Sequence, residues 1–237
     1  MATASRSPAK LLILAPHPDD EAISCGGLIA YCGRRGLGWE IDVAVMAAGE
    51  CRQLGTGKTE PTRRARELEE AALFGGYTAS FAFVGEQFMR LDALPRKTLC
   101  DLIEDRIESF RPDLVVIPPA SSYDQDHRAV AEAAVTALRH RPTSMRHCVP
   151  TVLEPDEPYW WRIDGQRPTP NFFVPLSEEQ LEAKLRLVAC HQSQDRPDPF
   201  GRSCDNLRRY AATYGVEIGG GFAEAYRLLR TRADVLF

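Results

Sequence analysis

Short, continuous apolar runs alternate with amphipathic stretches along the first 140 residues of the chain. A strand that is buried on both faces of a parallel sheet has this continuous apolar character, whereas a strand with one wet face alternates apolar and polar residues. The sequence therefore predicts four buried strands, at residues 11–14, 41–46, 81–84 and 113–117.

The stretches between these runs carry apolar side chains at helical spacing. Pro61 stands at the start of one such stretch and Gly75-Gly76 at its end, which is the usual asymmetry of helix termini. We expect helices at residues 22–35 (stopping at Gly36), 61–73, 95–110 and 127–140. Repeated strand–helix units of this kind predict an α/β fold, a Rossmann-like three-layer sandwich with a mainly parallel sheet.

The second half of the chain is less regular and rich in loops. Residues 142–175 are rich in proline and aromatic residues, and we expect short strands and long loops over one edge of the sheet. A helix at residues 177–190 and a last strand at 223–229 follow. The length of 237 residues predicts a single domain over residues 1–237, with residues 1–8 flexible.

Composition excludes several classes of function. The 33 acidic residues outnumber the 29 basic ones, which argues against a nucleic-acid-binding surface. No apolar run approaches the roughly 20 residues of a membrane helix, and the polar N-terminus does not resemble a signal peptide, so we expect a cytoplasmic protein without membrane contact. The seven cysteines form no CxxC pair, and Cys25 and Cys32 are expected to be reduced core residues.

Two clusters of histidine and carboxylate residues follow predicted strands. Residues 16–21 read Pro-His-Pro-Asp-Asp-Glu, and residues 123–127 read Tyr-Asp-Gln-Asp-His. The carboxyl ends of parallel strands share one rim, so this topology brings the clusters together. One His and one Asp from the first cluster plus one His from the second would leave an open position, as in a catalytic zinc site. Alternatively, the acids could only complement a helix dipole, and His127 could be an exposed helix residue.

The chain also resembles the LmbE-like (PIG-L) family of zinc-dependent de-N-acetylases, from about residue 10 to residue 230. The hallmark is the Pro-His-Pro-Asp-Asp-Glu segment at residues 16–21. Further segments match in order along the chain: Gly49-Glu50, Arg64 with Glu67, residues 111–115, Asp126-His127-Arg128, Lys184, residues 191–194 and residues 223–226.

The resemblance implies a function and a set of site residues. It implies hydrolysis of the N-acetyl amide of an amino-sugar-containing small molecule, releasing acetate and a free amine, in natural-product or thiol-cofactor biosynthesis. Frequent self-association in the family leaves a homo-oligomer open. The implied ligands of Zn²⁺, or of Fe²⁺ in vivo, are His17, Asp20 and His127. Asp19 is the implied general base and Asp126 orients the site, while Arg64, Glu50 and His191 are expected on the substrate side.

One position departs from the family pattern. Asp124 stands three residues before His127, where the family usually has a histidine that would stabilise the oxyanion. Asp124 could be protonated and act as a catalytic donor, or His191 or an arginine could supply the missing group. The third alternative is a modified function: deacylation of another acyl group, a different metal-dependent reaction, or sugar binding without catalysis.

Overall fold

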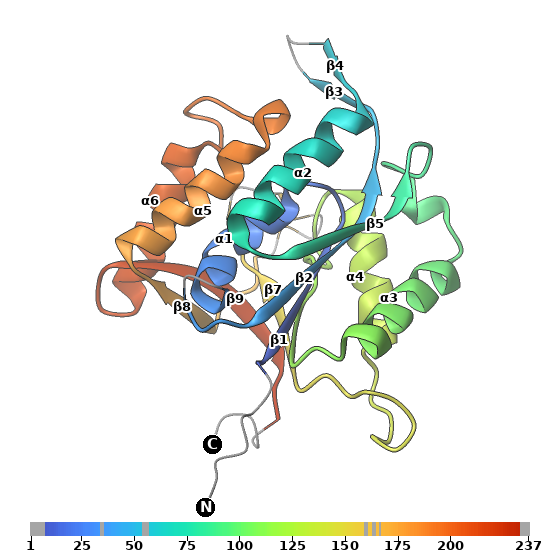
Figure 1. Cartoon of the computed structure of the whole chain (residues 1–237). Helices are drawn as coiled ribbons and strands as arrows, with labels where there is room; N and C mark the ends of the chain where they lie inside the picture. Colours follow the sequence, from blue (N-terminus) through green and yellow to red (C-terminus); the bar gives the residue numbers. More distant parts are fainter. Residues whose placement is uncertain are drawn as a thin grey trace, which may run out of the picture.

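A seven-stranded sheet forms the centre of the molecule (Figure 1). The computed structural model describes residues 8–33, 36–53, 57–158, 161–162, 165 and 167–232. The strand order is β5-β2-β1-β6-β7-β9-β8, parallel from β5 to β7, with β9 antiparallel to both of its neighbours. The strands are β1 (Lys10–Ala15), β2 (Glu40–Ala48), β5 (Thr78–Val84), β6 (Leu114–Val116), β7 (Thr151–Pro155), β8 (Phe172–Leu176) and β9 (Phe222–Arg230), and β3 (Cys51–Gln53) with β4 (Gly57–Thr59) forms a separate hairpin.

Helices cover both faces of this sheet. Helices α3 and α4 pack together on one face, whereas α1, α2 and α5 lie on the other, and α6 packs against both α5 and β9 (Figure 1). The mainly parallel three-layer α/β fold is as predicted. The helices are α1 (Asp20–Cys32), α2 (Pro61–Gly75), α3 (Arg96–Phe110), α4 (Gln125–Ala137), α5 (Glu178–Cys190) and α6 (Cys204–Glu217), with the short 3₁₀ turns η1 (Leu91–Ala93) and η2 (Gln192–Gln194).

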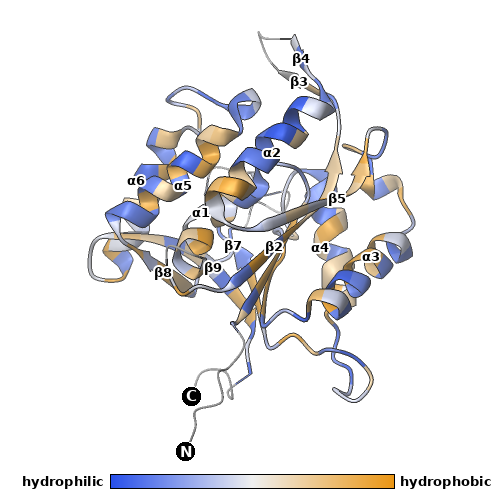
Figure 2. Cartoon of the chain, viewed as in Figure 1, coloured by the Kyte–Doolittle hydropathy of each residue, from blue (hydrophilic) through white to orange (hydrophobic). Residues whose placement is uncertain are grey.

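The apolar run of β1 serves two hydrophobic cores. Leu11 and Ile13 face the core beneath α1, α2 and α5, while Leu12 and Leu14 face the core beneath α3 and α4. Successive side chains of a strand point to opposite faces, so a strand between two helix layers must be apolar throughout. Figure 2 shows the result, with hydrophobic strands at the centre and hydrophilic outer helix faces.

The boundaries of α1 and α4 differ from the predictions. The first helix begins at Asp20 instead of residue 22 and ends at Cys32, because the chain already turns at Gly33, whose amide caps Ile29 O; the predicted stop at Gly36 is wrong. The helix predicted from His127 begins at Gln125 and ends at Ala137. Its earlier start follows from Asp124, whose side chain caps the helix.

The second half of the chain completes the sheet. The interpretation of residues 142–175 as cover over one edge is wrong for β7, which lies inside the sheet between β6 and β9. The predicted last strand is β9, and α6 was not predicted at all. Residues 1–7 of the segment predicted to be flexible lie outside the described residues. Within the described part of the chain, no helix has both the length and the apolar character needed to cross a bilayer.

Candidate metal centre

The two clusters of histidine and carboxylate residues meet because β1 and β6 are parallel neighbours. Both strands leave the sheet at its carboxyl edge, β1 toward α1 and β6 toward α4. One donor atom from each of His17, Asp20 and His127 lies within 4.8 Å of the other two, and all three side chains are buried. The structure thus brings together three side chains separated by up to 110 positions in the sequence.

The donor set of this cluster fits a divalent metal ion. His127 Nε2 lies 3.2 Å from Asp20 Oδ2, and His17 Nδ1 lies 3.7 Å from the same oxygen. In a tetrahedral zinc site with bonds of about 2.0–2.1 Å, neighbouring donor atoms are roughly 3.3 Å apart. Two imidazoles and one carboxylate suit Zn²⁺ and Fe²⁺ alike. The spacing and chemistry therefore match a centre with three protein ligands.

Asp126 fixes the orientation of His17. Its Oδ2 lies 3.1 Å from His17 Nε2, and its Oδ1 accepts the backbone amide of Leu91 at 2.9 Å. A proton on Nε2 that is donated to Asp126 leaves the Nδ1 lone pair directed toward Asp20. Histidine ligands in metal sites commonly use such a carboxylate partner, which sets the tautomer and raises the basicity of the ligand.

Negative charge dominates the cluster. Burial alone would raise the pKa of Asp20, but His127 and His17 outweigh it and hold that pKa well below its usual range. Burial alone would lower the pKa of His127, yet Asp20 and the more distant carboxylates of Glu157 and Asp124 raise it to about 9. The electric field at these side chains therefore favours a positive charge between them.

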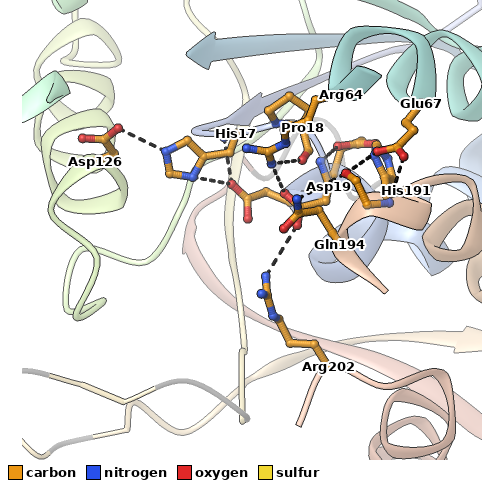
Figure 3. A network of polar contacts seen from close by, with 12 residues as sticks. His17, Pro18, Asp19, Arg64, Glu67, Asp126, His191, Gln194 and Arg202 are labelled. Carbon is orange, nitrogen blue, oxygen red and sulfur yellow. Dashed lines mark hydrogen bonds and ion pairs between the residues drawn. The ribbon is translucent and has the colours of Figure 1, made fainter. Parts of the chain in front are cut away.

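The Asp19 carboxylate lies between the side chains of Arg64 and Arg202 (Figure 3). Asp19 has a left-handed backbone conformation, with φ of 119°, which is costly for a residue with a side chain. Its carbonyl starts α1, but its carboxylate makes no capping bond to the helix. Instead Oδ1 accepts from Arg64 Nη2 at 3.1 Å, and Oδ2 faces Arg202 Nη1 at 3.5 Å. Burial raises the pKa of Asp19, and Arg64 opposes this effect.

Glu21 stabilises this unusual conformation from behind. Its Oε2 accepts the backbone amide of Asp19 at 3.0 Å. Its Oε1 accepts from His191 Nε2 at 2.7 Å and from the Tyr77 hydroxyl at 3.1 Å. Burial alone would lower the pKa of His191, but Glu21 outweighs it and raises that pKa. The predicted substrate-side residue His191 is thus buried against the carboxylate that holds Asp19.

The remaining predicted site residues lie in different places. Arg64 is buried on α2, where Nη2 donates to Pro18 O at 2.6 Å as well as to Asp19. Asp124 Oδ1 accepts the amides of Asp126 and His127 at the start of α4. Glu50 is exposed and pairs with Lys58 in the β3–β4 hairpin at 2.6 Å. The substrate-binding roles of Arg64 and Glu50 stay predictions.

Sequence reasoning missed Phe88 as part of the site. The Phe88 ring packs edge-on against the His17 ring, with centroids 4.9 Å apart. A Cβ on Gly49 would lie only 2.3 Å from Phe88 Cβ, so glycine is needed at that position. In the sequence, only the Gly49-Glu50 motif pointed to the place where Phe88 packs. Arg202 lies in an irregular loop and carried no signal that we used.

Side chains of two other elements form hydrogen bonds with the backbone in the middle of α1. The amides of Gly27 and Leu28 donate to the two carboxylate oxygens of Glu224 on β9, each at 2.7 Å. Ile23 O, in turn, accepts from Lys184 Nζ of α5 at 2.8 Å.

Tyr226 and two glycines complete this arrangement, which we call the α1 clamp (Lys184, Glu224 and Tyr226). The Tyr226 hydroxyl donates to Glu224 Oε2 at 2.7 Å and lies 3.4 Å from Ser24 O. A Cβ on Gly26 would lie 2.8 Å from Lys184 Cγ, and one on Gly27 would lie 2.7 Å from Glu224 Cδ. The clamp therefore holds the helix that begins with Asp20.

Residues 12–138, just over half of the chain, match the PIG-L family, described as GlcNAc-PI de-N-acetylase. The match contains all three donor residues of the cluster and Asp19. This chain belongs to the PIG-L family. The resemblance seen in the sequence is thereby confirmed.

This PIG-L protein is similar in sequence to one deacetylase and in fold to two solved structures. Diacetylchitobiose deacetylase of Thermococcus kodakarensis is 29% identical over 234 residues, covering 93% of this chain and 83% of that protein. The crystal structure of N,N′-diacetylchitobiose deacetylase from Pyrococcus horikoshii matches with a TM-score of 0.70 at 22% identity, over 98% of this chain and 90% of that one. The 4-carboxy-2-hydroxymuconate hydratase of Pseudomonas putida KT2440 matches with a TM-score of 0.71 at 19% identity, over 95% and 98% of the two chains.

Proposed function

We propose that this protein is a metal-dependent hydrolase that removes the N-acetyl group from an amino-sugar-containing small molecule. The observation that carries the proposal is the buried donor triangle of His17, Asp20 and His127 beside an Asp19 carboxylate that the helix does not use as a cap. The family and the deacetylase relatives support the reaction class. We propose Zn²⁺ as the ion, with Fe²⁺ as the alternative, and a role in natural-product or thiol-cofactor biosynthesis.

The residues have separate tasks in this reaction. His17, Asp20 and His127 would hold the ion, which supplies Lewis acidity toward the amide carbonyl and makes water easier to deprotonate. Asp19 takes the proton from the attacking water and returns it to the departing nitrogen, since an amine leaves readily only when protonated. Arg64 and Glu21 keep the Asp19 carboxylate and backbone in place.

Asp124 is proposed to act as the cap of α4. Its Oδ1 accepts two backbone amides, a task for which an aspartate carboxylate is well suited. Among the groups considered for the missing histidine, His191 already binds Glu21 through Nε2, whereas Arg202 faces Asp19 from another side. The three alternatives for Asp124 therefore predict different turnover for Asp124→Asn, a variant that keeps the cap.

A second candidate is a different reaction at the same centre, or binding of a sugar without turnover. The acidic residue at position 124 favours it, because a carboxylate there opposes an oxyanion. The likeness to a hydratase is one of fold alone, and it leaves hydration among the reactions to be tested.

Acetate release from a panel of N-acetylglucosaminides tests the proposal. Metal-free protein is reloaded with one equivalent of Zn²⁺ or Fe²⁺, and bound metal is measured in parallel. We expect turnover by the wild type, retained metal but about 10²- to 10⁴-fold lower kcat in Asp19→Asn, and lost metal in Asp20→Asn. Metal-replete wild type that releases no acetate from any member of the panel would favour the second candidate. Wild type that binds no metal would contradict both.

A further inference from the structure

The segment that follows β7 lies at the same rim of the sheet as the candidate metal centre. Strand β7 is parallel to its neighbour β6, so both strands end at the edge where β1 also ends. Asp156 anchors the segment, because its amide donates to Ala225 O at 2.9 Å. Its carboxylate accepts from the Tyr214 hydroxyl at 2.7 Å and from Arg167 Nε at 2.9 Å. The next residue, Glu157, is therefore held in a fixed place.

Glu157 is buried against α1, with only 2% of its surface exposed. Its Oε1 accepts from the Ser24 hydroxyl of α1 at 2.7 Å. Its Oε2 is buried as well, and within the described part of the chain it has no hydrogen-bond partner. A buried carboxylate oxygen without a partner is costly. The bond to Ser24 thus accounts for only one of the two oxygens.

A cavity of about 10 Å³ is lined by Glu157, by Ser24 and by two of the proposed metal ligands, Asp20 and His127. A buried water molecule needs roughly 10–15 Å³ and two to four polar partners. His127 Nε2 lies 3.2 Å from Asp20 Oδ2, so Nε2 is the nitrogen directed to the metal centre and Nδ1 is the outer one. Burial raises the pKa of Glu157, and His127 opposes this effect more than the Ser24 hydroxyl does.

We propose that Glu157 is a positioning residue of the metal centre, which holds the outer nitrogen of His127 through one water molecule bound in this cavity. His17 already has a carboxylate partner of this kind in Asp126. Histidine ligands commonly donate their second N–H to a carboxylate or a water, which fixes the ring and raises the basicity of the ligand nitrogen. The inference rests on the metal centre of the proposed function and adds a residue from a third strand end.

The Zn²⁺ affinity of Glu157→Gln, measured by competition with a chelator, tests this role. The amide keeps the size of the side chain and its oxygen can still accept from Ser24, whereas the negative charge is lost. We expect Zn²⁺ to bind about 10- to 100-fold more weakly than to the wild type. The visible absorption spectrum of the Co²⁺-loaded variant should also change, because it reports the geometry of the ligands. A variant with the affinity and the spectrum of the wild type would overturn the proposal.

Glu154→Gln is the matched control. Glu154 lies on β7 three positions before Glu157, is also buried, and pairs with Arg227 at 3.0 Å. The control removes an equally buried charge and should leave the Zn²⁺ affinity unchanged. Urea unfolding of the metal-free proteins shows whether each variant is folded.

Ser24→Ala separates the positioning of His127 from the attachment of Glu157 to α1. It removes the hydroxyl that binds Oε1 and leaves Oε2 in place, so it should weaken Zn²⁺ binding much less than Glu157→Gln does. Equal losses of affinity in the two variants would overturn the proposal, because Glu157 would then act only by holding α1.

A crystal structure of the Zn²⁺-loaded wild type examines the bridging water directly. We expect one water molecule within hydrogen-bond distance of Glu157 Oε2 and His127 Nδ1. Arg162 is the alternative partner, since its charge also favours the Glu157 carboxylate and its Nε and Nη1 are buried without an acceptor among the described residues. A Glu157 carboxylate bound to Arg162, with no water at His127, would contradict the proposal.

These measurements are separate from the acetate assay. A Zn²⁺ affinity that depends on Glu157 supports the positioning role even when the wild type releases no acetate from any glucosaminide. An affinity that does not depend on Glu157 overturns this role alone and leaves the deacetylase proposal standing. A wild type that binds no Zn²⁺ would contradict both.

Discussion

At the scale of single residues, the adjacent carboxylates of Asp19 and Asp20 have opposite surroundings. Asp20 faces two histidines, whereas Asp19 faces two arginines. The left-handed backbone at Asp19 separates them, and residues held in such conformations cost on the order of 1–3 kcal/mol. The bonds from Glu21 and Arg64 offset this cost. One side chain can therefore bind a cation while its neighbour is kept for proton transfer.

Asp124 gives a prediction at this scale. Because its carboxylate caps α4, Asp124→Ala should lose about 0.5–2 kcal/mol of unfolding free energy, measured in urea. Asp124→Asn can make the same cap and should stay within about 0.5 kcal/mol of the wild type. If the cap is the whole role, acetate release also survives in Asp124→Asn.

The same pair of variants separates the alternatives for this residue. A stable Asp124→Asn protein that keeps its metal but loses turnover would show that the carboxylate, charged or protonated, takes part in the reaction. Low turnover in Asp124→Ala alone would follow from a displaced His127, which the loss of bound metal would report.

Proximity to strand ends decided which site residues were predictable. His17 and Asp20 lie between the end of β1 and the first turn of α1, and His127 lies in the first turn of α4, the helix after β6; the parallel topology then places them together. The residues that hold Asp19 do not follow neighbouring strands. Arg202 is 183 positions away from Asp19 in the sequence, and His191, which binds Glu21, is 170 positions away from that glutamate. Contacts of this kind depend on how helices and loops pack, which local pattern does not encode.

At the scale of elements, α1 is held by side chains of α5 and β9. In the α1 clamp, the backbone of α1 forms hydrogen bonds with a buried ion pair of Lys184 and Glu224. A buried pair of this kind contributes less to net stability than to geometry, but removing one partner leaves an uncompensated charge. The clamp therefore controls the position of the helix that begins with Asp20.

We predict that Glu224→Gln lowers the unfolding free energy by about 3–5 kcal/mol and weakens metal binding. The variant places a donor where the amides of Gly27 or Leu28 need an acceptor, and it leaves Lys184 without its charge partner. Urea unfolding and metal titration measure the two effects.

The control for the clamp is Glu182→Gln on α5, an exposed acid paired with Arg208, which should change stability by less than about 1 kcal/mol. Lys184→Met combined with Glu224→Gln should cost less than the sum of the two single changes, because each removes the other's unpaired charge. Additive losses would show that the two side chains do not act as a pair.

Most elements were predictable, and the exceptions have physical causes. The helical spacing of apolar residues and the residues typical of helix ends located α2 and α5. Helix α6 was missed because few of its residues are buried, namely Leu207, Ala211, Tyr214 and Gly215. β7 was assigned to an edge because its short run lies among prolines and aromatics. β7 is an inner strand because β9, which comes much later in the sequence, pairs with it on the side opposite β6.

At the scale of the whole molecule, the candidate metal centre combines side chains from the segment between β1 and α1 with one from α4. We predict that loading with Zn²⁺ raises Tm, since a ligand at 100 times its Kd stabilises the folded state by about 2.7 kcal/mol. For a chain of this size, that corresponds to a shift of roughly 5–10 °C. Calorimetry of the protein with Zn²⁺ and after chelation measures it.

His17→Ala is the matching variant for this experiment. It removes one donor and leaves Asp126 without its histidine partner, so Zn²⁺ should shift its Tm little. The same Tm with and without the ion in the wild type would contradict a metal site that is formed by folding. An equal shift in both proteins would place the ion elsewhere.

The α1 clamp also has a consequence for how the protein is made. The segment that contains His17 and Asp20 is synthesised before α5 and β9, yet the side chains that hold its helix come from these two elements. A nascent chain that stops before Phe222 contains every proposed ligand but lacks Glu224 and Tyr226. The centre would then mature only after the last strand is synthesised, so that acquisition of the ion reports completion of the sheet.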